Sequence, residues 1–405
     1  MEQSPDGITS PGYRSGNRVK LVHGGSDYFG LLAQLIRKAR YTVHLQVYIY
    51  EDDATGMHIA DCLAAAARNG VQVYLLVDGY ASRSPWLSAG LVRRLRDAGV
   101  HFSRFEPLFK SRHFYFGRRL HHKVLVVDGC EALVGGINIC DRYNSDDGKP
   151  PWLDLALYVN GATARELEQI CCALWNDSIA APKVTPGKVN GEAAAPEDTM
   201  AAAVRVRRND WVKGKKQIWR SYANLLANAQ EEIIIACSYF LPGRTLLRLM
   251  SRAVKRGVAI RVIVAGPSDV MIAKHAERYL YRWLLAHRIR VFEYRKSVLH
   301  AKVGLTDSKR MTIGSYNINN ISAYASVELN LDVRNKPFVA SVKEQLEHIL
   351  RNDCVEITAA QYRADTGRLK RLWQYCCYRL IKMILRLFTF YFKREPGPRP
   401  SAAEA

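Results

Sequence analysis

Two histidines, each followed by a lysine and then an aspartate at the same spacing, stand in matching segments of this 405-residue chain. The two sets are His121, Lys123 and Asp128, and His300, Lys302 and Asp307. A histidine and a lysine two residues apart on an extended strand point to the same face, so both can reach one phosphate. An imidazole can attack phosphorus or carry a proton, and an ammonium group stabilises charge on phosphate oxygens. These residue types and their spacing therefore predict chemistry at a phosphodiester.

A second pattern, G-[G/S]-x-N, begins seven residues after each aspartate. It comprises Gly135, Gly136 and Asn138 in one segment, and Gly314, Ser315 and Asn317 in the other. Small residues let a turn approach a phosphate closely, where an asparagine amide can donate a hydrogen bond. We therefore expect Asn138, Asn317 and Ser315 to bind the substrate phosphate. Two such sets facing each other would form a complete phosphodiester site that needs no metal, and none of the nine cysteines has zinc-site spacing.

The elements around the two motifs repeat in the same order. Apolar runs typical of strands lie at residues 43–50 and 71–79 in the first half, and at 233–240 and 258–266 in the second. A helical segment separates the two runs in each half, which is typical of a sheet covered by helices on both faces. We predict an α/β fold of two duplicated domains, each a mixed sheet flanked by helices, with one active site at their interface.

Composition places the boundaries between these parts. We expect a disordered N-terminus (1–16), a first domain (17–181), a linker rich in Pro, Gly and Ala (182–203), a second domain (204–355), a C-terminal helical region (356–394) and a disordered tail (395–405). The polar N-terminal segment has no apolar run that would serve as a signal peptide, so the chain is expected in the cytosol.

The paired motifs and their G-[G/S]-x-N segments resemble the phospholipase D superfamily from Asn17 to about Cys354. The resemblance implies that one histidine attacks phosphorus to form a phosphohistidine and the other acts as acid and base. Family habit favours His121 as the nucleophile, although the sequence itself does not decide this.

The same resemblance implies an acidic residue downstream of each motif that orients a histidine. The candidates are Glu328, 28 residues after His300, and Asp154, 33 residues after His121. The alternative is that both are surface or strand-edge carboxylates. Asp128 and Asp307 belong to the catalytic motif, but by family pattern they hold the motif strand in place rather than touch phosphorus.

Within the superfamily the chain is similar to the bacterial cardiolipin synthases of the shorter type, which lacks two N-terminal membrane spans. VYIYEDDATG, VGGINICDRY, VFEYRKSVLHAKV and TIGSYNIN carry this similarity. It implies transfer of a phosphatidyl group between two phosphatidylglycerol molecules, giving cardiolipin and glycerol, without a metal or nucleotide cofactor. The chain begins close to the first domain, as expected of the short type.

The C-terminal region and the net charge of +21 both favour contact with an anionic surface. On a helix, six basic residues fall within a sector of about 80°, beside a wide apolar face. They are Arg368, Arg371, Arg379, Lys382, Arg386 and Lys393. We expect this helix to bind the cytoplasmic side of the bacterial inner membrane peripherally; the alternative is that it packs on the catalytic core or on a second subunit.

Three other functions stay open at this point. The acceptor could be water, which would make the chain a phospholipase D that releases phosphatidic acid. A nuclease of the same superfamily would also suit the positive charge, although no nucleic-acid module is recognisable. An inactive lipid-binding scaffold would have no need of both intact motifs.

Overall fold

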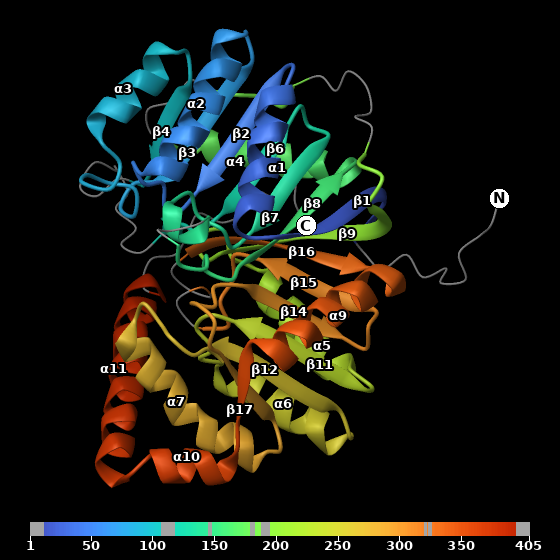
Figure 1. Ribbon diagram of the computed structural model, residues 1–405, viewed down its shortest axis with the longest axis vertical. Helices are drawn as coiled ribbons and strands as arrows, with labels where there is room; N and C mark the ends of the chain where they lie inside the picture. The colour runs from blue at the N-terminus through green and yellow to red at the C-terminus, as the bar shows by residue number, and fades with distance from the viewer. Residues whose placement is uncertain are drawn as a thin grey trace, which may run out of the picture.

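The computed structural model of the chain describes residues 12–106, 118–144, 148–178, 183–187, 195–319, 322 and 326–393, with side chains as far as residue 384. Figure 1 shows two halves of similar construction, one above the other. The first half runs from blue to green and the second from yellow-green to red.

The first half is a mixed sheet with helices packed against it. Its strands are β1 (Arg14–His23), β2 (Thr42–Val47), β3 (Gln72–Asp78), β4 (His101–Phe105), β5 (Arg119–Leu120), β6 (Lys123–Val127), β7 (Glu131–Gly135) and β8 (Leu155–Asn160), and its helices are α1 (Ser26–Lys38), α2 (Ala54–Arg68), α3 (Ala89–Asp97) and α4 (Ala162–Asn176). Strands β4, β3 and β2 are parallel neighbours, and β6, β7, β8 and β1 follow β2 as an antiparallel series.

The second half repeats this arrangement element by element. Its strands are β9 (Met200–Asp210), β10 (Lys215–Lys216), β11 (Glu232–Cys237), β12 (Ala259–Ala265), β13 (Arg290–Tyr294), β14 (Lys302–Thr306), β15 (Arg310–Gly314), β16 (Ser326–Arg334) and β17 (Cys354–Ile357), and its main helices are α5 (Gln217–Asn228), α6 (Arg244–Lys255), α7 (Met271–Ala286) and α9 (Lys336–Asn352). Strands β13, β12 and β11 are parallel neighbours, followed by antiparallel β14, β15, β16 and β9. The predicted duplicated α/β fold is confirmed.

The motif strands β6 and β14 are buried along their whole length. Because every residue of these strands is covered, no alternation of polar and apolar residues is needed, and their sequences KVLVV and KVGLT show none. Each motif strand therefore begins two residues after its motif histidine and continues directly into the core.

The halves are joined more closely than the sequence indicates. Strand β9 pairs with β1 of the first half as well as with β16, so one continuous sheet runs through both halves. One hydrophobic core contains residues of both, among them Val126, Leu157, Val303 and Leu331. Two predicted boundaries need correction as a result: β1 begins at Arg14, inside the predicted disordered N-terminus (1–16), and β9 begins at Met200, inside the predicted linker (182–203). Residues 182 and 188–194 of that linker, with residues 1–11 and 394–405, lie outside the described residues.

The predicted C-terminal helical region contains more than one element. Strand β17 ends at Ile357, the short helix α10 (Ala359–Asp365) follows, and the long helix α11 occupies Arg368–Lys393. Figure 1 shows α11 beside α7 at the edge of the second half. Among the described residues, every helix is too short or too polar to cross a bilayer.

Candidate active site

His121 is held at the boundary between the two halves. It lies between β5 and β6, and β5 pairs in parallel with β16 of the second half. The backbone N–H of His121 donates to the carbonyl of Val327 in β16 at 2.9 Å. The residue after Val327 is Glu328, so this backbone bond brings His121 beside a carboxylate of the other half.

His300 is held by the equivalent contacts in reverse. Its backbone N–H donates to the carbonyl of Leu153 at 2.7 Å, and the N–H of Ala301 donates to the same oxygen at 3.0 Å. Leu153 belongs to the first half and is followed by Asp154. Each motif histidine is therefore placed by backbone bonds to the segment that carries the other half's acidic residue.

The two carboxylates pair with the histidines across the halves. Nδ1 of His121 lies 2.8 Å from Oε2 of Glu328, and Nδ1 of His300 lies 2.6 Å from Oδ2 of Asp154. Both carboxylates are fully buried, so the alternative of surface carboxylates is wrong. Each acidic residue orients the histidine of the opposite motif rather than the histidine that precedes it in its own half. With Nδ1 engaged, Nε2 is the ring nitrogen that can attack phosphorus or carry a proton.

The residue after the first glycine of G-[G/S]-x-N differs between the halves because it lies beside a different carboxylate. The Ser315 hydroxyl donates to Oε2 of Glu328 at 2.5 Å and accepts from the N–H of Leu329. At Gly136 a Cβ atom would meet both oxygens of Asp154 at 2.5 Å, so a serine does not fit there. The hydroxyl of Ser315 is thus hydrogen-bonded to Glu328 in this structure. The predicted contact between Ser315 and phosphate stays a prediction.

Both motif lysines are buried beside their histidines. Nζ of Lys123 donates to the carbonyl of His121 at 3.0 Å, and Nζ of Lys302 also donates to the carbonyl of His300. Nζ of Lys302 lies 2.8 Å from Nδ1 of His300, so that nitrogen stands between a cation and the carboxylate of Asp154. Two lysine side chains and two imidazoles are therefore gathered in one place, an arrangement suited to an anionic substrate.

The His121–Glu328 pair favours an ionised carboxylate and a neutral imidazole. Burial acts to raise the pKa of Glu328, but His121, its hydrogen bond and Lys123 outweigh burial and leave this pKa below its usual range. Burial lowers the pKa of His121; Glu328 opposes this shift, and Lys123 and Lys302 add to it. A neutral imidazole backed by a carboxylate is the state that a nucleophile requires.

In the His300–Asp154 pair, by contrast, the carboxyl group tends to keep its proton. Burial raises the pKa of Asp154 to about 7, against the opposing charge of Lys302. Burial, followed by Lys302, Lys123 and His121, lowers the pKa of His300 well below its usual value. A buried pair of this kind retains a shared proton near neutral pH, which is what a general acid needs. Charges of both halves act on both histidines, so the two motifs form one site.

The two asparagines contact protein groups in this structure. Asn138 accepts from the N–H of Ile49 at 3.1 Å and donates to the hydroxyl of Tyr143 at 3.0 Å. Asn317 accepts from the hydroxyl of Ser238 at 2.9 Å. Both asparagines therefore brace the loops that follow β2 and β11, and their predicted contact with phosphate stays a prediction.

Asp128 and Asp307 lie at the far ends of the motif strands, away from the histidines. Asp128 accepts from the N–H groups of Arg40, Tyr41 and Thr42 at 2.8–2.9 Å. Asp307 accepts from the equivalent N–H groups of residues 230–232 at 2.9–3.1 Å. Each aspartate occupies a turn with positive φ (50° and 52°). They anchor the start of the neighbouring strand, in agreement with the role that the family pattern implies.

Asp307→Ala is therefore expected to affect stability more than catalysis. The change removes three hydrogen bonds to a carboxylate and puts alanine at positive φ, which should lower the free energy of unfolding by about 1–3 kcal/mol. Hydrogen bonds outweigh burial and lower the pKa of Asp307, so its contribution is present above about pH 4 and lost as pH falls further. Urea unfolding measures the loss. Asp307→Asn tolerates the backbone conformation and should lose less, and a dead but fully stable alanine variant would contradict the anchoring role.

Several residues near the histidines were not found from the sequence. The ring of Tyr48 contacts that of His121 at 4.8 Å, and the rings of Tyr143 and Trp152 lie 5.1 and 6.0 Å from that of His300. The fully buried Asp78 accepts from the N–H of Leu120, the residue before His121, at 2.9 Å. Aromatic residues and a strand-end aspartate are common in any α/β sheet, so sequence pattern alone gave no signal for them.

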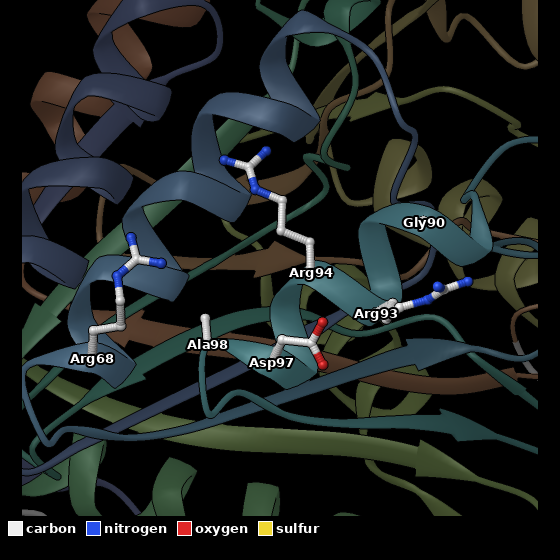
Figure 2. A pocket seen from close by; sticks show the side chains of 6 residues that line it. All are labelled: Arg68, Gly90, Arg93, Arg94, Asp97 and Ala98. Carbon is white, nitrogen blue, oxygen red and sulfur yellow. The ribbon is translucent and has the colours of Figure 1, made fainter.

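A separate hollow of about 590 Å³ lies on the outer side of the first half. Residues of α2 and α3 line it, including Arg68, Arg94 and Asp97, and Figure 2 shows Arg93 extending away from Arg68. It contains no residue of either motif, and Arg94 is already paired with Asp61. The hollow is therefore not part of the candidate active site.

Comparison with known proteins agrees with this geometry. A family model described as "Cardiolipin synthase, PLD-like domain" matches residues 32–148 and 222–350, one segment in each half. Cardiolipin synthase B of Salmonella typhimurium is 32% identical over 388 residues, which cover 95% of this chain and 89% of that protein. Cardiolipin synthase B of Escherichia coli K12 is 31% identical over 386 residues, with the same coverage.

The fold is also similar to a solved structure. Phosphatidylserine synthase of Haemophilus influenzae superposes with a TM-score of 0.69 at 15% identity, over 93% of this chain and 94% of that one. At this identity the likeness extends to the fold.

Proposed function

The chain belongs to the family of cardiolipin synthases with phospholipase D-like domains and is a phosphatidyltransferase. We propose that it transfers a phosphatidyl group from one phosphatidylglycerol molecule to another, and that the reaction passes through a phosphohistidine. The observation that carries the proposal is the crossed pairing of His121 with Glu328 and of His300 with Asp154. It leaves His121 beside an ionised carboxylate and His300 beside a carboxyl group that can hold a proton near neutral pH, which suits the first pair to attack and the second to acid catalysis.

In the first step Nε2 of His121 attacks the phosphorus of a phosphatidylglycerol. A P–N bond forms, the bond from phosphorus to the glycerol oxygen breaks, and the His300–Asp154 pair supplies the proton that lets glycerol leave. Lys123 and Lys302 stabilise the non-bridging oxygens as negative charge develops on them. Glu328 stabilises the positive charge that the attacking imidazole acquires.

In the second step the free terminal hydroxyl of another phosphatidylglycerol attacks the phosphohistidine. His300 accepts the proton of this hydroxyl, the P–N bond breaks, and cardiolipin forms. The His300–Asp154 pair donates a proton in the first step and accepts one in the second, so it ends the cycle in its original protonation state. The cations required are side chains of the chain itself, and we expect turnover to continue in EDTA.

Analysis of lipid products by mass spectrometry tests this proposal. Purified protein is mixed with phosphatidylglycerol vesicles in EDTA, and cardiolipin and glycerol are expected in equal amounts. Phosphatidic acid as the sole product would make water the acceptor. The absence of any lipid product would contradict phosphatidyl transfer. The substrate would then be another phosphodiester, and nucleic acid would be assayed next.

The pH dependence of kcat/KM is expected to fall on the alkaline side with an apparent pKa near 7. Burial raises the pKa of Asp154 to about 7, so the acid pair loses its proton as pH rises through this value. Burial also lowers the pKa of Lys123 to about 7, so positive charge is lost over the same range. The acid limb should lie below pH 6.5 because the pKa of His121 is lowered.

Initial rates with a soluble short-chain phosphatidylglycerol, measured from pH 5 to 9, test this expectation. Rates that keep rising to pH 9 would contradict the assignment of a buried acid. Asp154→Asn serves as the matched variant, because it removes one of the two groups that titrate near pH 7 and should alter the alkaline limb.

We also propose that the protein binds the surface of an anionic membrane through α11. Residues Gln374 and Cys377 are buried, and the ring of Tyr378 contacts that of Tyr279 in α7 at 5.0 Å, so one face of the helix packs on the core. The opposite face is exposed and divided in two. Its apolar stripe, spanning about 120° at 100° per residue, consists of Leu369, Leu372, Trp373, Leu380, Met383 and Ile384. The neighbouring basic stripe consists of Arg368, Arg371, Arg379 and Lys382.

With these two faces, α11 can both pack on the catalytic core and bind a membrane, the two alternatives expected for the C-terminal region. Packing on the core uses one part of the wide apolar face, and the remainder stays available for lipid, beside cations that suit anionic headgroups. The side chains of Arg386 and Lys393 lie beyond the described side chains. Binding to the cytoplasmic leaflet of the inner membrane is part of the same proposal.

A further inference from the structure

Three consecutive large apolar residues are exposed at the start of α7. The side chains of Val270, Met271 and Ile272 are 45%, 59% and 46% exposed. Isolated apolar residues are common on protein surfaces, but a contiguous exposed group marks a contact surface. We refer to these three residues as the apolar tip.

The apolar tip lies on the catalytic side of the second half. It follows the loop at the C-terminal end of β12, in which Asp269 accepts from the hydroxyl of Tyr239 at 2.6 Å. Tyr239 comes directly after Ser238, whose hydroxyl donates to the carbonyl of His300 at 3.3 Å. A short series of bonds therefore connects the loop before the apolar tip with the backbone of His300, so the tip and the site lie at the same end of strand β12.

The apolar tip also adjoins the apolar stripe of α11. His275, one turn further along α7, contacts the ring of Trp373 with 6.2 Å between ring centroids. Trp373 is 55% exposed and belongs to the stripe. The two apolar surfaces are therefore neighbours, and the basic stripe of α11 flanks them.

We propose that the apolar tip inserts into an anionic bilayer and, together with α11, holds the entrance of the catalytic site against the membrane. This inference rests on the proposed function, in which both substrates are membrane lipids. The flanking cations favour an anionic lipid surface as the occupant. A second copy of a chain with a net charge of +21 would bring like charges together at this surface.

The test compares a triple variant with a matched control. The variant Val270→Ser/Met271→Ser/Ile272→Ser removes the apolar tip. The control Met200→Ser/Val355→Ser removes two exposed apolar side chains, 41% and 46% exposed, from strands β9 and β17. Three quantities are measured: co-sedimentation with vesicles of phosphatidylglycerol and phosphatidylcholine, transfer on those vesicles, and transfer with a short-chain phosphatidylglycerol below its micellar concentration.

The triple variant is expected to lose at least about tenfold in vesicle affinity and in transfer on vesicles, because half-exposed apolar side chains no longer enter the bilayer. Turnover of the monomeric substrate should stay within twofold of the parent, and the control should match the parent in all three measurements. Unchanged vesicle affinity would overturn the inference. A change of oligomeric state by light scattering with unchanged affinity would instead assign the surface to a second copy.

Failure of the proposed function is recognised separately. A parent protein that turns over neither substrate would contradict phosphatidyl transfer, while the co-sedimentation arm would still decide whether the apolar tip binds membranes.

Discussion

His121→Ala and His300→Ala should each reduce phosphatidyl transfer by at least about 10⁴-fold, since each removes a group that forms or breaks a bond to the reacting atoms. The two side chains are only 15% and 8% exposed, so each variant is first checked for native circular dichroism and an unchanged unfolding midpoint. Activity is then measured as cardiolipin formed by folded protein. A variant that retains a tenth of the parental rate would remove that histidine from the reaction.

A donor lipid with a p-nitrophenyl leaving group separates the two roles. Nitrophenolate is a stable anion that departs without a proton, so His300→Ala should recover most of the first step and release nitrophenol in a burst. His121→Ala lacks the nucleophile and should release none. The reverse result would exchange the roles of the two histidines.

Glu328→Gln is expected to lower kcat on the order of 10²–10⁴-fold, because the amide keeps the shape of the side chain but removes its charge. The pKa of Glu328 is lowered, so this carboxylate is ionised when His121 attacks and can stabilise the resulting positive charge. Single-turnover rates with a short-chain substrate measure the loss, and an unchanged KM would place it in the transition state.

Histidine NMR titration of the same variant tests the crossed pairing. Glu328 raises the pKa of His121, so Glu328→Gln should lower that pKa further and leave His300 little changed. Asp154→Asn is the matched control, and it should shift the pKa of His300 rather than that of His121. Because burial raises the pKa of Asp154 to about 7, its charge is already partly lost near neutral pH, and its effect on kcat should be smaller. A larger shift at His300 than at His121 in Glu328→Gln would contradict the crossed arrangement.

The side chains that we propose to react could be found from the sequence because spacing alone determines which side chains share a strand face. His121 and Lys123, and His300 and Lys302, occur at a strand start with both side chains beside one site. Repetition of the motif indicated the duplicated fold. The roles of Asp128 and Asp307 followed from family pattern, and their backbone hydrogen bonds agree with it.

The crossed carboxylates could not be predicted in the same way. Sequence order places Glu328 after His300, but pairing of β5 with β16 and the bridge between Leu153 and Leu299 bring each acid to the other half. Pairing between distant strands is set by tertiary packing, which local spacing does not encode. Ser315 was therefore assigned to phosphate from its place in G-S-x-N, although its hydroxyl contacts Glu328.

The membrane-facing surfaces illustrate the same limit. The basic sector of α11 was visible in the sequence because helix periodicity determines it. Which part of the apolar face packs on α7, and which stays exposed, depends on the partner helix. At the start of α7 the residues Val270, Met271 and Ile272 have the composition of a core segment, and their exposure is a property of the folded chain.

The most direct test of the mechanism is to trap the covalent intermediate. His300→Ala is mixed with the p-nitrophenyl donor lipid, denatured at alkaline pH, where the P–N bond of phosphohistidine survives, and analysed by intact-protein and peptide mass spectrometry. We predict one phosphatidyl group on the peptide that contains His121, and none in the His121→Ala/His300→Ala double variant. A phosphatidyl group on another residue, or nitrophenol release at the same rate with no adduct, would contradict transfer through His121.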